Sequence, residues 1–132
     1  MNLASEHIPV FRDRFAGFAD GVVSEFRVIL KPYPQLCRLL ILAQDREVRS
    51  GWSKVLFEIC DVHEFRFERQ RSTFEVLSSG VQFVWQRDLI FVVLDARPFD
   101  SSDLPDLSRN AAYVAGSTCT WEVLDHDSAE HA

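Results

Sequence analysis

The chain is poor in the residue types that build most recognisable catalytic sites. Its 132 residues include only five glycines, four histidines and three cysteines. The glycines do not gather into a phosphate-binding or dinucleotide-binding loop, and the sequence contains no nucleophile-elbow, zinc-protease or P-loop motif. The enzyme classes that are recognised by these motifs are therefore excluded, and a protein without catalytic activity is favoured.

The cysteines give no sign of a metal or redox site. Cys37, Cys60 and Cys119 form no C-x-x-C pair, are odd in number, and each lies in a stretch that reads as a strand. We expect reduced, mostly buried thiols, as is usual in a cytoplasmic protein. No cofactor and no metal are expected.

Long apolar runs and clustered positive charge are also missing. No segment reaches the roughly 18 apolar residues that a membrane-spanning helix needs, and charges interrupt the first fifteen residues, where a signal peptide requires an apolar run. The formal net charge is −6, whereas binding to phosphates needs clustered Lys and Arg. We therefore expect a cytoplasmic protein with no membrane and no nucleic-acid partner.

Apolar and aromatic residues, in contrast, are plentiful. Hydrophobic residues make up 47% of the chain, and eleven residues are Phe, a composition that suits a β-rich core. The length fits one domain with a core of its own. We predict a single β-rich domain over residues 1–124 and a polar, poorly ordered tail over residues 125–132.

The strongest single prediction is a β-hairpin over residues 80–95 with a two-residue turn at Arg87 and Asp88. This turn places Trp85 opposite Ile90, and the pairing continues residue by residue to Val81 opposite Leu94. One face of the hairpin is then entirely apolar: Val81, Phe83, Trp85, Ile90, Val92 and Leu94. A two-sided apolar second strand indicates that both faces are covered.

Further strands follow from the alternation of apolar and polar residues. Residues 21–31 and 36–44 each predict one strand, the first with Val22, Phe26 and Val28 on its apolar face. The apolar alternation of residues 52–68 changes phase once. This change predicts a bulge or tight turn at 60–62 that points Val62 inward. The segment is then either one bent strand or a short hairpin. Residues 112–124 form either one strand or a hairpin that turns at 116–117.

A short amphipathic helix is predicted near the amino terminus. Phe11, Phe15 and Phe18 follow helical spacing, and Pro9 is tolerated in the first turn. We expect this helix to cover one face or one open end of the sheet, with an interaction helix as the alternative. Residues 1–8 read as a loose lead-in. The predicted fold is mainly β, with six to eight antiparallel strands as a barrel or a sandwich.

The candidate binding residues are large aromatic side chains. Trp and Tyr are enriched at interface hot spots and also line small-ligand pockets in β-barrel mouths. The candidates for interaction or ligand binding are Tyr33, Trp52, Trp85, Tyr113 and Trp121. For Trp85, which lies on the apolar face of the hairpin, packing in the core is the alternative. Tyr33 stands between two prolines and is expected to be exposed.

His63 is the acid/base candidate, because it is the histidine that falls inside a predicted strand. To act, it would need an orienting carboxylate such as Asp61 and a pocket. The acidic loop over residues 100–106 suggests a calcium site as one interpretation. Its acidic residues are spaced by three, and a proline stands where a calcium loop needs its glycine. A solvated, helix-capping loop is therefore the preferred interpretation.

Three stretches together are similar to a known group of proteins. These are FADG at residues 18–21, VLFEICDVHEFRF at 55–67, and YVAG at 113–116 ahead of WEV at 121–123. They resemble small bacterial β-rich proteins of uncharacterised function, some of them grouped with immunity proteins of contact-dependent toxin systems. The resemblance implies a cytoplasmic, non-enzymatic protein that binds and blocks a toxin domain.

The sequence therefore predicts a small, non-catalytic interaction protein whose partner is another protein or a second copy of itself. The alternative is a small-ligand-binding β-barrel with an aromatic-lined pocket. An exposed apolar patch of several hundred Å² would favour interaction, and an enclosed pocket of at least roughly 300 Å³ would favour a ligand.

Overall fold

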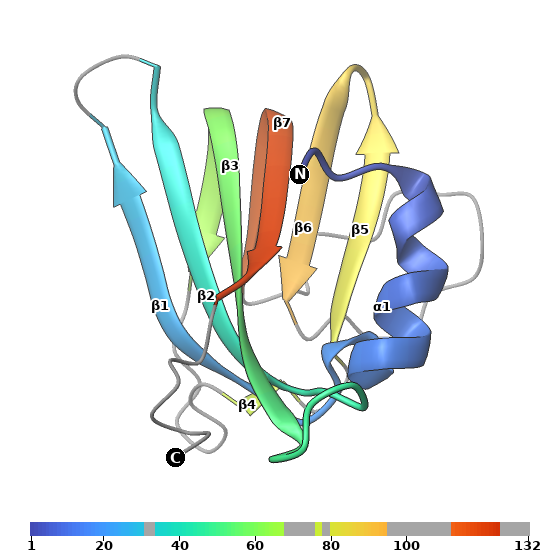
Figure 1. Ribbon diagram of the computed structural model, residues 1–132. Coiled ribbons are helices and arrows are strands. Elements are labelled where there is room, and N and C mark those ends of the chain that lie inside the picture. Colours follow the sequence, from blue (N-terminus) through green and yellow to red (C-terminus); the bar gives the residue numbers. More distant parts are fainter. Residues whose placement is uncertain (31–33, 68–75, 78–79, 95–111, 125–132) are drawn as a thin grey trace.

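The computed structural model describes residues 1–30, 34–67, 76–77, 80–94 and 112–124 (Figure 1). Within them, seven antiparallel strands form one sheet in the order β4-β1-β2-β3-β7-β6-β5. The strands are β1 (Gly21–Ile29), β2 (Leu36–Gln44), β3 (Trp52–Phe67), β4 (Val76–Leu77), β5 (Val81–Gln86), β6 (Leu89–Leu94) and β7 (Ala112–Val123).

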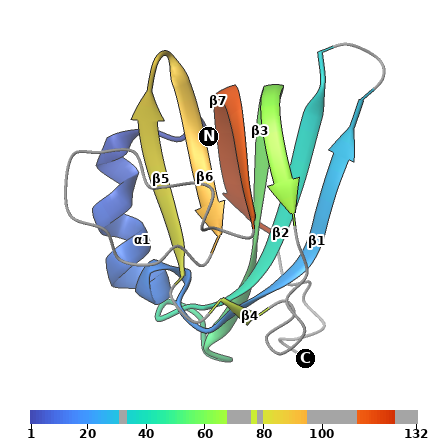
Figure 2. The same cartoon turned by 180° about the vertical axis from the view of Figure 1, so that it is seen from behind.

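The sheet is curled into a half-barrel, so the predicted fold class is confirmed: mainly antiparallel β, with one short helix near the amino terminus. The described strands make neither a closed barrel nor two separate sheets. The helix α1 (Ile8–Phe15) lies on the open side of the half-barrel beside β5, while β1 lies at the opposite side of the molecule (Figures 1 and 2). The concave face of the sheet and the helix enclose the main core.

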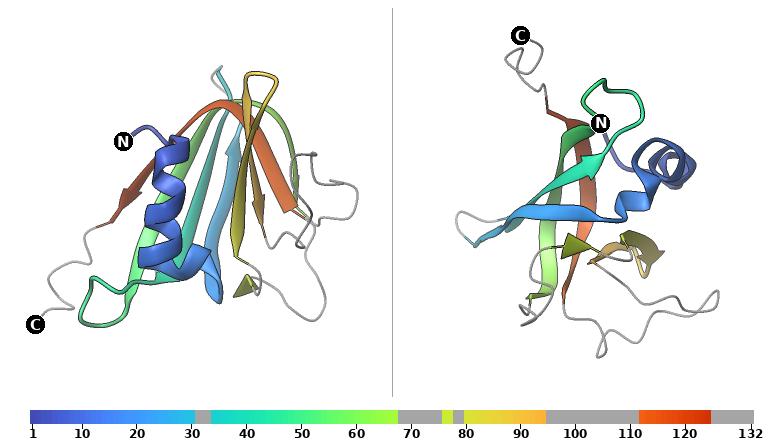
Figure 3. Two further views of the ribbon diagram at one scale, coloured as in Figure 1. Left: turned by 90° about the vertical axis from the view of Figure 1, so that its right-hand side faces the viewer. Right: turned by 90° about the horizontal axis from the view of Figure 1, so that it is seen from below.

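The half-barrel owes its curl to a sharp bend in the paired strands β3 and β7 (Figure 3). In β3, Asp61 adopts a φ of 57°, and the register with β7 shifts between Val62 and Glu64. This is the predicted bulge, and Val62 is buried as expected. Opposite the bulge stands Gly116, where a Cβ atom would lie 2.5 Å from the Cγ2 of Ile59. Glycine is required here because the bend brings the two backbones together.

Both strands continue through this bend without interruption. Of the two alternatives for residues 112–124, the structure therefore selects one long strand, and residues 52–67 are likewise one bent strand. The bend divides each strand into two parts with different neighbours. The first part of β3, up to Cys60, pairs with β2, and the first part of β7, up to Gly116, pairs with β6.

The hairpin β5–β6 has the predicted register throughout, from Val81 opposite Leu94 to Gln86 opposite Leu89. Arg87 and Asp88 both have positive φ values, of 55° and 63°. Two positive values in a two-residue loop are the geometry that matches the right-handed twist of a hairpin. The chain accepts this conformation although neither residue is glycine.

The amphipathic helix covers the open side of the sheet, as predicted, and this sheet is that of its own chain. Phe11, Phe15 and Phe18 are at most 2% exposed. The ring of Phe11 meets those of Phe57 and Trp121 edge to face, at centroid distances of 6.0 and 4.9 Å. The helical segment begins with a 3₁₀ turn (Ser5–His7) and ends in another (Ala16–Phe18). Since the three Phe side chains are buried inside the molecule, the alternative of an interaction helix is wrong.

The first residues are not a loose lead-in, and this prediction is corrected. The amide of Leu3 donates to the carbonyl of Cys119 at 2.8 Å, and the amide of Trp121 donates to the carbonyl of Met1 at 2.9 Å. These bonds place residues 1–3 along the edge of β7 beyond the end of β6. Leu3 is buried there. A segment with no periodic pattern is thus held by backbone bonds, which sequence periodicity does not report.

The apolar face of β1 also differs from the prediction, because a bulge at Ser24 shifts the register with β2 between Val23 and Glu25. Before the bulge, Val23 points into the core and is buried, whereas Val22 is half-buried. After the bulge, Phe26 and Val28 pack against the core as predicted. One inserted residue is enough to exchange the two faces of a strand.

A buried ionic cluster joins the loop after β2 to the end of α1. Asp45 is 2% exposed, and the Nε and Nη2 atoms of Arg14 donate to its two carboxylate oxygens at 2.9 and 3.0 Å. The hydroxyl of Ser53 and the amide of Glu47 donate to the same carboxylate. Burial alone raises the pKa of Asp45. The bonds from Arg14, Ser53 and Glu47 outweigh this effect, so the pKa lies below its ordinary value.

Candidate functional site

The structure does not bring the predicted aromatic residues together into one site. Trp52 and Trp85 are 39% and 42% exposed, at separate places on the sheet, whereas Trp121 is 8% exposed. Tyr113 is half-buried on β7. Tyr33 lies outside the described residues. Trp52 and Trp85 therefore mark two different surfaces, and each is considered in turn.

Trp121 belongs to the core. Its ring meets Phe11 edge to face at 4.9 Å and His7 at 5.4 Å. Its indole nitrogen is buried without a hydrogen-bond partner. Trp121 thus ties α1 to β7, and a contact with a partner is not needed to explain its position.

Trp52 borders an apolar region on the outer face of β1, β2 and β3. The outer face consists of the side chains that point away from the core on these three strands. An antiparallel sheet with a solvated outer face normally carries polar residues there. Here the outward positions of β2 are Leu36, Arg38, Leu40, Leu42 and Gln44, three of which are apolar. The apolar pattern was visible in the sequence, but only the register with β1 and β3 shows how far it extends.

Neighbouring strands continue the apolar character of the outer face. The strand registers place Val22 beside Leu42, Ile29 beside Leu36, and Leu56 beside Leu40. Leu56 is only 5% exposed, although it belongs to neither of the two core clusters. Strand alternation places Trp52 on the same side as Leu56. The outer face is thus largely apolar around Leu40, Leu42 and Leu56, and the exposed Lys54 separates this region from Trp52 on β3.

A row of charged side chains also crosses this face, with Arg38 between Leu36 and Leu40 on β2. Arg38 lies between two carboxylates, with its Nε 3.6 Å from Glu25 and its Nη1 3.4 Å from Glu58. The three side chains are between 32% and 38% exposed. Such half-exposed pairs add little to stability, so their effect is to fix the position of one guanidinium group in the middle of the outer face.

Tyr113 lies on the outer side of the other half of the sheet. Its hydroxyl donates to the carboxylate of Glu64 at 2.9 Å. Burial raises the pKa of Tyr113, and the bond to Glu64 and its negative charge raise it further. Tyr113 also packs against a small second core cluster of Phe91, Val93 and Ala115. A structural role therefore accounts for these contacts.

His63 does stand beside the carboxylate that sequence reasoning named for it. Its Nε2 lies 3.5 Å from Asp61, and the two side chains are 52% and 41% exposed. The hydroxyl of Ser117 donates to Asp61 at 2.6 Å. A nucleophilic serine would instead need its hydroxyl bonded to the histidine. The carboxylate therefore occupies the place that a general base would take, and the cluster lacks the order of a catalytic triad.

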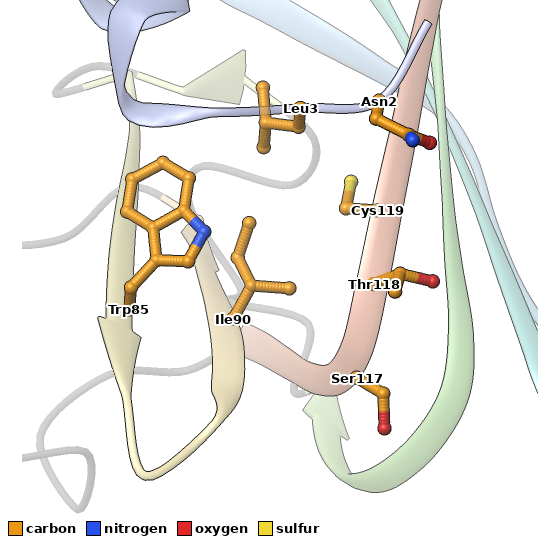
Figure 4. A pocket seen from close by; sticks show the side chains of 7 residues that line it. All are labelled: Asn2, Leu3, Trp85, Ile90, Ser117, Thr118 and Cys119. Carbon is orange, nitrogen blue, oxygen red and sulfur yellow. The ribbon is translucent and has the colours of Figure 1, made fainter.

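Trp85 borders a pocket of about 160 Å³. It lies where the hairpin β5–β6 meets β7 and the first residues of the chain (Figure 4). The residues that line it are Asn2, Leu3, Trp85, Ile90, Ser117, Thr118 and Cys119. The pocket is smaller than the roughly 300 Å³ typical of sites for drug-sized ligands. Packing of Trp85 in the core, the alternative considered from the sequence, is not observed.

The described residues contain no group of three or more His, Cys, Asp or Glu side chains able to hold a metal ion. The acidic loop over residues 100–106 and the polar tail over 125–132 lie outside the described part of the chain. Among the helices that the structure describes, none has the length and apolar character needed to cross a bilayer.

Comparisons with known proteins add no relative. The chain matches no protein-family model, no curated protein and no solved structure.

Proposed function

We propose that this chain is a non-catalytic protein-binding protein and that its binding surface is the outer face of β1, β2 and β3. The observation that carries the proposal is the apolar character of this face, with Leu36, Leu40 and Leu42 on β2. Contiguous apolar patches rimmed by polar groups on a protein surface are typical of interaction sites.

The arrangement of side chains supports this proposal. Leu40, Leu42 and Val22 are half-buried on this face, and Trp52, beyond Lys54 on β3, has 39% of its surface exposed. Tryptophan is among the residues most often found at energetic hot spots. The row of Arg38 with its two carboxylates provides fixed charges, which favour a correctly oriented partner over others.

The specific form that we propose is an immunity-type role in the bacterial cytoplasm, in which the chain binds and blocks a toxin domain. Support comes from the resemblance of the stretches 18–21, 55–67 and 113–123 to small bacterial β-rich proteins, some of which are grouped with immunity proteins. A net charge of −6 suits a basic partner. A second copy of the chain is the other partner that this face would accept.

A substitution in the centre of the outer face tests the proposal. Leu40→Glu places a charge among the apolar side chains and is expected to weaken partner binding by about 30-fold or more. The matched control is Val10→Glu, because Val10 is 42% exposed on α1 and lies outside the outer face. Circular dichroism and thermal unfolding establish that both variants are folded.

Two measurements distinguish the partners. Light scattering after size exclusion, on dilute and concentrated samples, shows whether the 15.2 kDa chain is a monomer or a dimer. A dimer that Leu40→Glu dissociates would identify a second copy as the partner. A monomer calls for affinity capture from cells that express the protein, with both variants in parallel. If no dimer and no captured protein depend on Leu40, the proposed surface is wrong.

A further inference from the structure

The pocket beside Trp85 arises from a gap along one edge of β7. On this edge β7 pairs with β6 up to Gly116, which stands opposite Ile90. Beyond the gap, Leu3 bonds to Cys119 and takes over the pairing. Ser117 and Thr118 lie between these two neighbours, and the pocket opens beside them. The pocket thus lies where this edge of β7 changes from one neighbour to the other.

Four of the seven residues that line this pocket have apolar side chains, and the other three are polar. The side chains of Leu3, Trp85, Ile90 and Cys119 surround the same space, and the nitrogen-bearing edge of the Trp85 indole faces it (Figure 4). Leu3, Ile90 and Cys119 are each at most 8% exposed, so three walls are fixed in the core. Trp85 is 42% exposed and forms the wall next to solvent.

No lining side chain carries a full charge at neutral pH. Asn2, Ser117 and Thr118 are polar but neutral, and burial raises the pKa of the Cys119 thiol to about 12, so that it stays protonated. A charged ligand would lose its hydration without gaining an opposite charge. The chemistry of the lining therefore selects for an uncharged ligand.

We propose that this pocket binds a small, uncharged, single-ring aromatic molecule that carries one hydrogen-bonding group, with phenol as the simplest example. Its volume of about 160 Å³ is close to the roughly 150 Å³ of an apolar cavity that holds benzene. The Trp85 ring supplies an aromatic wall for stacking or edge contacts. The indole N–H of Trp85, on the edge of the ring that faces the pocket, supplies a polar group for the ligand's hydroxyl. This site is separate from the outer face and independent of the proposed protein partner.

Three simple probes test the class of ligand on the intact chain. Phenol, benzene and cyclohexanol are titrated separately while the indole N–H signals of the tryptophans are followed by NMR. We expect phenol to bind with a dissociation constant on the order of 1 mM or tighter and to shift the signal of Trp85 but not that of Trp52. Benzene should bind roughly fivefold more weakly, because it lacks the hydroxyl. Cyclohexanol should bind more weakly still, because its ring is saturated and cannot make aromatic contacts with Trp85.

Two tryptophan variants form a matched pair. Trp85→Ala should weaken phenol binding about tenfold or more, whereas Trp52→Ala, which removes an equally exposed indole elsewhere, should leave it unchanged. If Trp85→Ala disturbs the hairpin, Trp85→Phe keeps the aromatic wall without the N–H, and should retain benzene binding while losing the preference for phenol.

Three results would overturn the proposal. These are no shift of the Trp85 signal at about 10 mM phenol, equal binding of phenol by Trp85→Ala, or equal affinity for cyclohexanol and phenol. The outer-face proposal is tested separately, because Leu40→Glu should leave phenol binding intact.

Discussion

Removing the charge of Asp45 should destabilise this protein far more than its position in a surface loop would suggest. Asp45→Asn keeps the shape of the side chain but abolishes its negative charge. In the folded chain this carboxylate is buried and receives two bonds from Arg14, one from Ser53 and one from the amide of Glu47. The substitution removes the buried carboxylate beside Arg14 and leaves it the exposed carboxylate of Glu47, 3.4 Å away.

The expected cost follows from how far Arg14 can escape into water. Removing one partner of a fully buried ion pair costs about 3 to 5 kcal/mol. The side chain of Arg14 is 21% exposed, so it can recover part of its hydration. We therefore expect Asp45→Asn to lower the free energy of unfolding by about 2 to 3 kcal/mol, or the midpoint of thermal unfolding by roughly 8 to 12 °C.

The loss should depend on pH in a defined direction. The pKa of Asp45 is lowered in the folded state, so its contribution is present above the unfolded value near 3.9 and is lost as the pH falls through the folded value. In this range the unfolded chain binds the proton more readily, which favours unfolding of the native protein. The difference in stability between the native chain and Asp45→Asn should therefore narrow below about pH 4.

Urea unfolding at pH 7 and at pH 3, followed by circular dichroism, measures both effects. Glu47→Gln is the matched control, because Glu47 also approaches Arg14, at 3.4 Å, but is 66% exposed. That change should cost less than about 0.5 kcal/mol. An Asp45→Asn variant as stable as the control at pH 7 would refute the reasoning, as would a stability difference that grows toward low pH.

Further predictions concern glycines and cysteines. Gly116→Ala should lower the free energy of unfolding by about 2 kcal/mol or more, because its Cβ would meet Ile59 and the carbonyl of Cys60. Gly17→Ala, with a φ of 64° but open space around it, should cost only about 1 kcal/mol, and thermal unfolding compares the two. In the native chain, iodoacetamide should modify the half-buried Cys60 before the buried Cys119. Burial raises the pKa of the Cys119 thiol to about 12, which keeps it protonated and unreactive. Mass spectrometry after timed labelling gives the order, and equal rates would contradict it.

The alternation of apolar and polar residues was enough to predict the register of the hairpin and the position of one bulge. The register of β5 and β6 follows from the length of one turn, and the bulge at Asp61 follows from the need to bury Val62 while leaving His63 in water. The bulge at Ser24 left no such signal, because both faces of β1 carry apolar residues before it. Periodicity detects a phase change only where one face is polar.

The candidate surfaces were less accessible to sequence reasoning, for a physical reason. Alternation gives the face of Trp85 but not how far along the strand the core extends. Trp85 pairs with Ile90, which is at the end of the paired region of β6 and β7. Beyond Ile90, the neighbour of β7 is the amino-terminal segment. The burial of Asp45 is also a tertiary effect, because it depends on Arg14 from a helix more than thirty residues earlier. Neither fact is encoded in a window of neighbouring residues.

The bent pair of strands β3 and β7 has a consequence for how the molecule is made. Val55 pairs with Val123 and Phe67 with Ala112, so the central seam of the sheet joins positions far apart in the chain. Contacts of such long sequence separation slow folding, because a large loop must close before they form. As the chain leaves the ribosome, β1, β2 and β3 emerge well before β7, with one edge of β3 still unpaired. An unpaired strand edge is prone to wrong association, so we expect the newly made chain to be most vulnerable to aggregation just before its last strand emerges.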